Sequence, residues 1–521
     1  MRLELLYTGA RNACFRLADG GLYHTLEVYD LRINGEISGR IRTVVHSLFG
    51  LKPNGEYKLE IIKGSDIAAA VTFRTKDEYI TLDPRDFGAK GDGVKDDTAA
   101  IQAAILSCPA KSRVLLSKGR YLVSGIFLKS HIRLEIAKGA VLLLTADRQS
   151  VPILPGMTES WDEENYYNLG TWEGNPLSMH AALITGIDAE DVEIYGEGLL
   201  DGQAQLGGWW QQAKSKQKAW RGRMLFLNRC RGVTVQGLSF QNSPSWNLHP
   251  YFSEDLNFFN LNIEAPADSP NTDGFNPESC RHALMAGTRF SLGDDCVAIK
   301  SGKLYMGSTR QTPCEDITIM NCLMENGHGG VTIGSEMAGG VRNVLVQDCL
   351  MKHTDRGLRI KTRRGRGRQG KIDNIHFKRV SMENVKCPIV INCRYACDPD
   401  GHSIYVQSRE KLPIDERTPF VGLLSFEDIQ ADGCHWAAAY MEGLAEQKIA
   451  RVAISRARFS YAADAQSAPP AMADQVEACK KGGIIGYNID TLALNQVQFE
   501  GCEGKKLALR NVSQVIGEID P

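Results

Sequence analysis

Four short clusters of reactive side chains follow one another in the middle of the chain. They are Asn271-Thr272-Asp273-Gly274, Gly293-Asp294-Asp295-Cys296, Gly327-His328-Gly329 and Arg359-Ile360-Lys361. Carboxylates transfer protons, histidine titrates near neutral pH, and arginine and lysine bind anions. Together these residue types indicate acid–base chemistry beside a bound carboxylate.

The spacing brings the acids together if each cluster lies on one coil of a repeating structure. Asp273 and Asp295 are 22 residues apart (295 − 273), and stacked parallel strands lie about 4.8 Å apart. Asp294 and Asp295 would point to opposite faces of a flat strand, so we expect a turn or bulge at Gly293. Adjacent carboxylates repel one another, so at least one pKa should rise. A protonated acid beside an ionised base suits glycoside hydrolysis, whereas an isolated Asp-Asp pair is commonly a solvated turn.

A histidine and two cations follow the acids. His328 lies between two glycines, where we expect the backbone to pass close to a neighbour. Arg359 and Lys361 alternate at i and i+2, so they share one face of a strand and could hold a carboxylate. The segment 356–371 carries eight cations and no acid. We interpret it as an electropositive lip that attracts an acidic polysaccharide, because it lacks the interleaved aromatic residues of a nucleic-acid site.

Apolar residues recur at offsets 0, 2, 5 and 7 along the chain, with steps between segments that run from 23 (256 − 233) through 27 (344 − 317) to 31 (375 − 344) residues, and with longer gaps elsewhere. The segments are Val233/Val235/Leu238/Phe240, Leu256/Phe258/Leu261/Ile263, Ile317/Ile319/Cys322/Met324, Val344/Val346/Cys349/Met351, Ile375/Phe377/Val380/Met382, Val452/Ile454/Ala457/Phe459 and Leu492/Leu494/Val497/Phe499. Two short strands repeated at this period are typical of a right-handed parallel β-helix.

The chain divides near Asp83-Pro84. Residues 1–80 show short alternating strands and turn signals, and the segment 50–57 resembles the corner of a fibronectin type III sandwich. Residues 83–521 form the predicted β-helix. A helix over 99–105 is expected to cover the first coil, since a repeat stack needs such a cap. The predicted fold class is therefore all-β, with a small β-sandwich before the β-helix.

Bulk composition excludes several classes of protein. The 521 residues carry a net charge of −2 and 43% apolar residues, so we expect no nucleic-acid partner and no membrane partner. The first residues lack the apolar run of a secretory signal, so we predict a cytoplasmic protein, or a secreted one if a signal has been removed. Fourteen cysteines without a CxxC pair predict reduced core thiols rather than a metal site. We expect no metal and no cofactor, and the oligomeric state stays open.

The four clusters resemble those of the polygalacturonase family of glycoside hydrolases, over roughly residues 83–515. The resemblance implies a parallel β-helix and hydrolysis with inversion of the anomeric carbon in galacturonan. It implies that Asp294 is the general acid, and that Asp273 and Asp295 activate the attacking water. His328 matches the histidine that tunes the acid or positions the substrate.

The same resemblance implies the substrate-binding residues. Arg359 and Lys361 match the cations that hold the galacturonate carboxylate. Asn271 matches a supporting residue of the site, and Tyr395 matches a late tyrosine. No metal or organic cofactor is implied.

Further segments resemble the bacterial exo-acting branch of the family. These are Trp172 to Asn175, Asp201-Gly202 with Trp209-Trp210, and Ser245 to Pro250. Extra loops can block one end of an open groove and leave room for a chain end only. Trp172 and His249 are the expected walls of a terminal-sugar pocket, whereas Trp209 and Trp210 could equally be packing residues.

Three other functions stay open. The same architecture occurs in rhamnogalacturonan and unsaturated pectic oligosaccharide hydrolases. Pectate lyases also use parallel β-helices, but they need a basic proton acceptor and usually calcium. A carbohydrate-binding β-helix without catalysis is the alternative that is not an enzyme.

Overall fold

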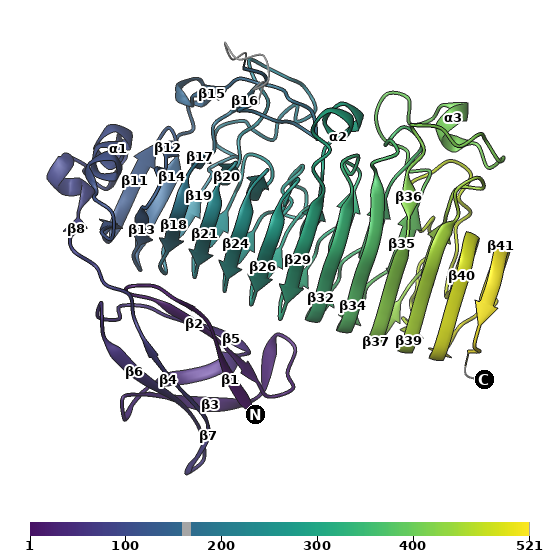
Figure 1. The fold of residues 1–521 in the computed structure, drawn as a ribbon, viewed down its shortest axis with the longest axis horizontal. Coiled ribbons are helices and arrows are strands. Elements are labelled where there is room, and N and C mark those ends of the chain that lie inside the picture. The colour runs from purple at the N-terminus through teal and green to yellow at the C-terminus, as the bar shows by residue number, and fades with distance from the viewer. Residues whose placement is uncertain (159–167, 520–521) are drawn as a thin grey trace.

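The computed structural model describes residues 1–158 and 168–519 and shows two parts (Figure 1). The first part holds seven strands in two antiparallel sheets. One sheet has the order β1-β2-β5 and the other the order β4-β3-β6-β7. Their bounds are β1 Arg2–Thr8, β2 Ala13–Ala18, β3 His24–Ile33, β4 Glu36–Thr43, β5 Val45–Leu48, β6 Glu56–Lys63 and β7 Asp66–Arg74. The fibronectin type III resemblance of this part stays a prediction.

The second part is a right-handed parallel β-helix, in which 28 strands form one continuous sheet. The long face starts at β8 (Thr81–Leu82) and continues through β10 Arg113–Leu116, β13 Arg133–Ile136, β18 Glu190–Tyr195, β21 Arg231–Gln236, β24 Glu254–Phe259, β26 Arg281–Ala286, β29 Cys314–Met320, β32 Val341–Lys352, β34 Lys371–Glu383, β37 Leu423–Cys434, β39 Ile449–Tyr461 and β40 Gly482–Glu500. A short second face starts at β9 (Asp92–Asp96) and continues through β11 Gly119–Val123, β14 Ala140–Leu144, β19 Leu199–Asp201, β22 Ser239–Gln241, β25 Asn262–Glu264, β27 Arg289–Ser291 and β30 Leu323–Glu325.

A third face carries the strands that position the site. Its strands are β12 Ile126–Phe127, β17 Ile184–Ile187, β20 Leu225–Asn228, β23 Leu248–Tyr251, β28 Val297–Ile299, β31 Val331–Gly334, β33 Arg356–Lys361, β35 Cys387–Asn392, β38 Ala437–Glu442 and β41 Leu507–Ile516. The short strand β36 (Phe420–Val421) pairs with the start of β34 on the long face. Outside these faces lie β15 Ile153–Leu154, β16 Met179–His180 and the short helices η1 Pro84–Phe87, η2 Arg148–Ser150, α2 Leu304–Arg310 and α3 Ile404–Gln407.

The strand register confirms the repeat that the apolar offsets predict. Val344 pairs with Ile375 and Met351 pairs with Met382, so equivalent side chains stack inside the coil. Leu424, which is not part of the predicted apolar segments, pairs with both Ile375 and Val452 and so lies on a coil between them. The aliphatic ladders fill one core that runs the length of the β-helix.

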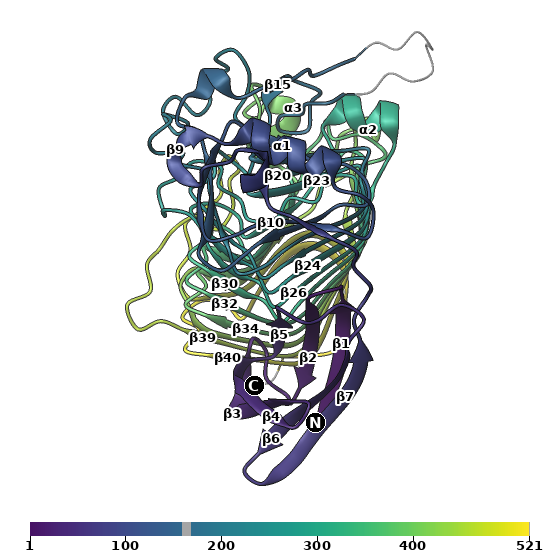
Figure 2. The same ribbon diagram turned by 90° about the vertical axis from the view of Figure 1, so that its left-hand side faces the viewer.

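Helix α1 (Thr98–Ser107) covers the N-terminal end of this core, as predicted (Figure 2). Ile101, Ala104 and Ile105 are its buried side chains. Asp97 precedes the helix but does not cap it. Its carboxylate accepts backbone hydrogen bonds from Lys90 (2.7 Å) and Gly91, and so fastens the preceding loop.

The cysteines lie mostly in the core and form no disulfide bonds, as the composition predicts. All fourteen cysteines are free, and eleven of them are buried (14 minus the half-buried Cys397, Cys479 and Cys502). Within the part of the chain that the structure describes, no helix is long and apolar enough to cross a membrane.

Candidate active site

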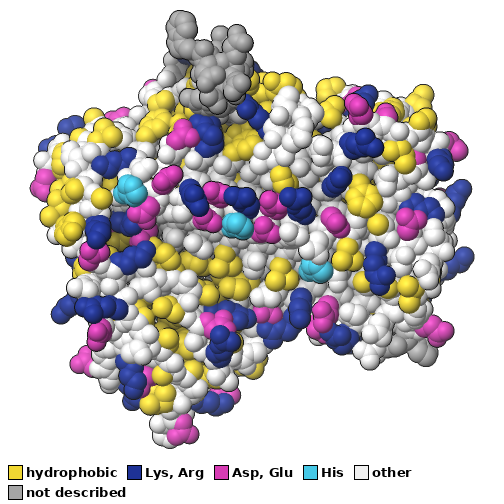
Figure 3. Space-filling view, in the orientation of Figure 1, with side chains coloured by type: hydrophobic (Ala, Val, Ile, Leu, Met, Phe, Trp, Pro, Cys, Tyr) yellow, Lys and Arg dark blue, Asp and Glu magenta, His cyan; other side chains and the backbone are white. Residues whose placement is uncertain are grey.

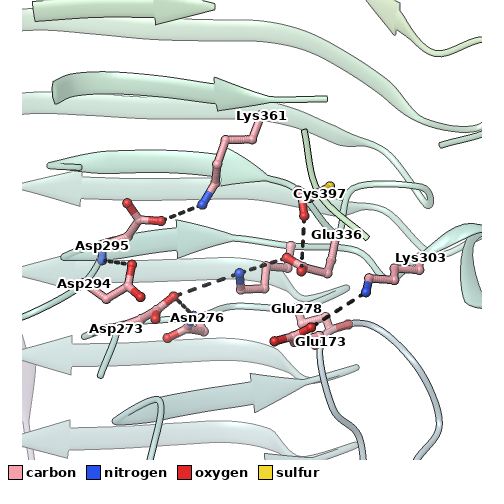
Figure 4. Close-up of polar contacts among 12 residues, drawn as sticks. Glu173, Asp273, Asn276, Glu278, Asp294, Asp295, Lys303, Glu336, Lys361 and Cys397 are labelled. Atoms are coloured by element: carbon pink, nitrogen blue, oxygen red, sulfur yellow. Dashed lines mark hydrogen bonds and ion pairs between the residues drawn. The ribbon is translucent and has the colours of Figure 1, made fainter. Parts of the chain in front are cut away.

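The three aspartates come together on adjacent coils, as their spacing predicts. Phe275 forms parallel bridges with Leu248 and Val297, and the Gly274 amide donates to the carbonyl of Asp295 (3.1 Å). This register places Asp273 beside Asp295. One carboxylate oxygen of each of Asp273, Asp294 and Asp295 lies within 4.8 Å of the other two, and Figure 4 shows the three side chains meeting in one place.

A bend between β27 and β28 lets neighbouring aspartates face the same side. The chain bends at Gly293 and Asp294, and the Asp295 amide donates to Oδ1 of Asp294 (2.9 Å). Gly327 lies directly against this bend. A Cβ atom there would sit 2.7 Å from the Asp294 carbonyl oxygen and 2.8 Å from the Cys296 sulfur, so only glycine fits. The predicted turn at Gly293 and the predicted close approach beside His328 are both present.

Asp295 is the ionised carboxylate of the cluster. Lys361 Nζ lies 2.8 Å from its Oδ2 and Arg359 Nη1 lies 3.4 Å from its Oδ1. Burial alone would raise the pKa of Asp295. The two cations, Lys361 first, outweigh burial and hold that pKa well below its usual range.

Asp273 is the carboxylate of the cluster whose pKa is raised. Burial, and then the charge of Asp294, raise the pKa of Asp273 to about 7, although Lys300 opposes the rise. The expected rise of one pKa in the cluster is thus found at Asp273, whereas the resemblance gives the acid role to Asp294. Asp273 is 3% exposed and Asp295 1%. Both are enclosed by charged and polar groups rather than by the apolar core, and Asp294 is half-buried and open to solvent.

His328 is exposed and lies at the edge of the cluster. Its Nδ1 lies 2.9 Å from Oδ2 of Asp355, whose Oδ1 accepts from Lys386 (2.7 Å). The hydrogen bond to Asp355 raises the pKa of His328, and burial opposes that rise. The backbone amide of His328 donates to the Asp294 carbonyl (3.2 Å). The raised pKa favours the protonated form of His328 beside the acids, and the role of His328 in tuning or positioning stays a prediction.

Arg359 and Lys361 project from the same face of β33, as their alternation predicts. Both lie near the ring of Tyr395, at 5.8 and 5.7 Å from its centre. Arg359 Nη2 also contacts the sulfur of Met472 at 3.1 Å. In this structure the two cations neutralise Asp295, and their role in holding a substrate carboxylate stays a prediction, as does the role of Tyr395.

The basic segment 356–371 does not form an electropositive lip, and this prediction is wrong. Arg363, Arg364 and Arg366 are buried. Acids from later loops neutralise them, because Arg364 binds Glu446 (2.6 Å), Arg363 binds Asp400 (2.8 Å) and Arg366 binds Asp398 (3.0 Å). The segment 356–371 itself contains no acid, so the fold brings these partners to its arginines.

The structure places two expected pocket walls in the interior instead. His249 is fully buried, with Nε2 3.0 Å from Glu278 and Nδ1 accepting from Arg223 (3.3 Å). Trp172 is 4% exposed and stacks on Trp220 at 4.7 Å. Neither ring is available to a sugar in this structure, which corrects both assignments.

The structure also shows the surroundings of Asn271, Trp209 and Trp210. Asn271 accepts a hydrogen bond from Arg221 (2.6 Å) through its Oδ1. This bond leaves the amide nitrogen as the group that can face a ligand, and the supporting role of Asn271 stays a prediction. Trp209 is fully buried and packs in the core, and the Trp210 nitrogen donates to the Ser243 carbonyl.

Sequence reasoning missed Lys300 and Glu336, of which Figure 4 labels Glu336 near the aspartates. Lys300 Nζ lies 3.0 Å from Oε2 of Glu336 and 4.0 Å from Oδ2 of Asp273. Strand alternation could have identified the lysine. Val297 and Ile299 fill the core, so Ala298 and Lys300 must face outward.

The aspartate cluster is also the one group of acids in the described residues that is close enough together to hold a metal ion. Lysine and arginine already neutralise Asp295, and Lys300 adjoins Asp273. We therefore assign the cluster to proton transfer and assign no metal to it.

A right-handed parallel β-helix that gathers acids, a histidine and cations at one place on its outer surface is a carbohydrate-active enzyme with an acid–base site. Comparison with known families narrows the class. Residues 132–406 match glycosyl hydrolases family 28, and residues 83–136 match a family described as rhamnogalacturonase A/epimerase, pectate lyase-like. The first match spans 275 of 521 residues (406 − 132 + 1). The chain belongs to glycosyl hydrolases family 28.

Individual relatives agree with this assignment. A probable polygalacturonase of Vitis vinifera is 29% identical over 406 residues, which cover 76% of this chain and 77% of the relative. An endo-polygalacturonase of Pectobacterium carotovorum subsp. carotovorum is 32% identical and covers 57% and 72%. The fold of a Yersinia enterocolitica family 28 exopolygalacturonase superposes with a TM-score of 0.73 at 17% identity, covering 100% of this chain and 99% of that one. A Thermotoga maritima exopolygalacturonase gives 0.64 at 26% identity, covering 81% and 92%.

Proposed function

We propose that this protein hydrolyses the α-1,4-galacturonosyl linkages of polygalacturonate and its oligosaccharides. The observation that carries the proposal is the side-by-side arrangement of three carboxylates with the pair Arg359 and Lys361. Carboxylates of opposite protonation state suit cleavage of a glycosidic bond. A guanidinium and an ammonium beside them suit a sugar that carries its own carboxylate. Relatives named polygalacturonase, in both endo and exo forms, support this substrate.

Each charged residue of the site has its own role in the proposed hydrolysis. Asp294, which solvent reaches, protonates the leaving oxygen. Asp273 and Asp295 hold the attacking water, and Asp273 helps to activate it once Asp273 has released its own proton. A uronate carboxylate entering the site competes with Asp295 for Lys361 and Arg359, so substrate binding itself makes Asp295 a stronger base. No step needs a metal or an organic cofactor.

We propose further that cleavage proceeds from the non-reducing end. The similarity to a solved structure titled exopolygalacturonase supports this mode. The segment 168–180 supports it as well, because Gly174 lies against Glu336 and its carbonyl accepts from the Lys303 amide (2.9 Å). Digestion of a defined galacturonate hexamer tests it. Free galacturonate and a pentamer are the expected first products, whereas a mixture of dimers to tetramers would refute the exo assignment.

The stereochemical outcome needs its own measurement. Proton NMR during the first minutes of hydrolysis identifies the anomer that is released first. The β-anomer is expected from inversion at an α-linkage. First release of the α-anomer would refute inversion while leaving hydrolysis intact.

A second candidate shares the fold but cleaves a neighbouring linkage. The match of residues 83–136 to a rhamnogalacturonase-like family is the observation that favours it. Comparing turnover on galacturonan and rhamnogalacturonan oligosaccharides separates the two. An unsaturated product, lost on addition of a chelator, would instead indicate a lyase.

A further inference from the structure

Aromatic rings and cations alternate in a column that ends at the active site. The Trp172 ring stacks on Trp220, with centres 4.7 Å apart. The Arg223 guanidinium lies 4.9 Å from the centre of Trp172 and 4.5 Å from that of Trp246. Lys300 Nζ lies 4.6 Å from the centre of Trp246. A cation at this distance from a tryptophan ring is held by the ring's negative face, more strongly when water is excluded.

The last cation of the column is directed at Asp273 without bonding to it. Lys300 is 3% exposed, and its ammonium divides between Glu336 Oε2 at 3.0 Å and Asp273 Oδ2 at 4.0 Å. The hydrogen bond to Asp273 Oδ2 comes instead from Asn276 (2.8 Å). Lys300 therefore acts on Asp273 through its charge, and small displacements of the ammonium change that effect because few water molecules screen it.

We infer that Lys300 is a positioning residue of the reaction: its ammonium, held by the Trp246 ring and by Glu336, determines how readily Asp273 releases its proton. This inference rests on the proposed function, because it concerns the side of the site that activates water. Substrate and the reacting atoms need not touch Lys300.

Other titratable groups face Asp273 from the neighbouring elements. They are Asp294, Asp295 and Cys296 at the bend before β28, Lys361 on β33, and Arg221 and Arg223 before β20. Burial and Asp294 raise the pKa of Asp273, and Lys300 is the strongest of the cations that lower it. The proposed variants leave Arg221 and Arg223 unchanged, so differences in pH dependence among the variants report on Lys300.

Two substitutions that break the same ion pair should shift the reaction in opposite directions. In Lys300→Met the pKa of Asp273 rises, so the acidic limb of the kcat/KM profile moves up by about one to three pH units. In Glu336→Gln the ammonium loses its competing carboxylate and acts on Asp273 alone, so the acidic limb moves down. Lys303→Met is the matched control. Lys303 belongs to the same network of ion pairs, because its Nζ lies 2.7 Å from Oδ1 of Asp398, but it is not one of the groups around Asp273. The acidic limb of the Lys303→Met profile should therefore stay at its wild-type pH.

The Trp246 ring gives a graded test of the column. Trp246→Leu removes the aromatic face and should move the acidic limb up, in the direction of Lys300→Met. Trp246→Phe keeps a weaker face and should move it less. If Lys300 and Glu336 serve only to stabilise the fold, the variants lower the melting temperature while all acidic limbs coincide, which overturns the inference.

A readout without turnover separates this inference from the proposed function. If the wild-type protein hydrolyses no galacturonan, the proposed function fails. Carbon-13 NMR titration of labelled aspartate carboxyl groups, assigned with Asp273→Asn, then compares Asp273 in wild type, Lys300→Met and Glu336→Gln. An upward shift in the first variant and a downward shift in the second uphold the inference, and identical titrations refute it.

Discussion

At the scale of single residues, the three aspartates differ because their partners differ. Asp295 binds two cations and Asp273 is buried beside another acid, whereas Asp294 is half-exposed and its Oδ1 accepts the next backbone amide. The general acid must reach the leaving oxygen, and Asp294 is the member of the cluster that solvent reaches. Proximity in sequence therefore does not make Asp294 and Asp295 equivalent.

Replacing Asp294 with asparagine tests its role as the acid. Turnover on galacturonate oligosaccharides should fall by about 10²–10⁴-fold, because the positioned proton donor is lost. Substrate binding should remain, since Arg359 and Lys361 are untouched, and calorimetry on the inactive variant measures it. Asp268→Asn is the control, an exposed aspartate shortly before the cluster. Equal turnover in the two variants would contradict the assignment.

The contact between His328 and Asp355 predicts a pH effect. Asp355 raises the pKa of His328, so the histidine stays protonated to a higher pH than it would alone. Asp355→Asn removes that support. If the histidinium is needed, the alkaline limb of activity should move down by about one unit. Lys386→Met removes the other partner of Asp355 and keeps the histidine contact, so its alkaline limb should stay near that of the wild type. An alkaline limb unmoved by Asp355→Asn would exclude histidine as the titrating group.

At the scale of elements, charges of alternating sign follow the coils along the long face. Equivalent positions on successive coils are Glu190, Arg231, Glu254, Arg281, Glu315, Arg342 and Asp373, each in register with the next. Figure 3 shows basic and acidic side chains alternating in a row across this face. Opposite charges on neighbouring strands favour the observed pairing, and like charges opposite one another destabilise it. If a coil paired with the next coil but one instead of with its neighbour, like charges would lie opposite one another. The alternating row therefore favours the observed pairing of the coils.

Reversing one charge in this row should weaken the stack. Glu254→Arg puts three arginines in line and should lower stability by about 1 kcal/mol at low salt, since cross-strand charge pairs contribute roughly 0.2–1 kcal/mol each. Glu254→Gln, which removes attraction without adding repulsion, should cost less. Thermal unfolding measures both variants, and a Glu254→Arg variant as stable as Glu254→Gln would contradict the idea.

The elements also show what the sequence could predict. Core positions recur at fixed short offsets because each coil buries its own alternate residues, so the ladder from Val344 to Ile375 is visible in the sequence. The aspartate cluster follows from the same period. The partners of Arg364 and Lys300 could not be found that way. Glu446 is 82 residues from Arg364, and Glu336 is 36 residues from Lys300. Their meeting depends on loop paths that no periodicity encodes.

At the scale of the whole molecule, the N-terminal sandwich is fastened to the long face of the β-helix. Cys14, Val44 and Val45 pack on Phe259, Ala286 and Met320. Arg16 adds hydrogen bonds to Asn321 and Asp348, each 2.8 Å long. The side chains of the site come from β33, from the segments that lead into β28 and β31, and from Asp273, which precedes the bridge residue Phe275 on the same face. The sandwich therefore contacts a different face. Docking of the sandwich and catalysis should therefore be separable.

Gly287 offers a way to separate them. Its φ is 69°, and a Cβ atom there would lie 2.4 Å from the Cβ of Val45. Gly287→Ala should push the sandwich off the β-helix, open the connection between β7 and β8 to proteases, and increase the radius of gyration measured by small-angle X-ray scattering. Gly232→Ala is matched in backbone strain, with φ of 65°, but its nearest neighbour would be 3.7 Å away. The control should therefore stay compact. Hydrolysis of short galacturonate oligosaccharides should continue in both variants, because the aspartate cluster is unchanged. Loss of turnover in Gly287→Ala alone, with the melting temperature of the β-helix preserved, would show that the sandwich supports catalysis and would overturn this separation.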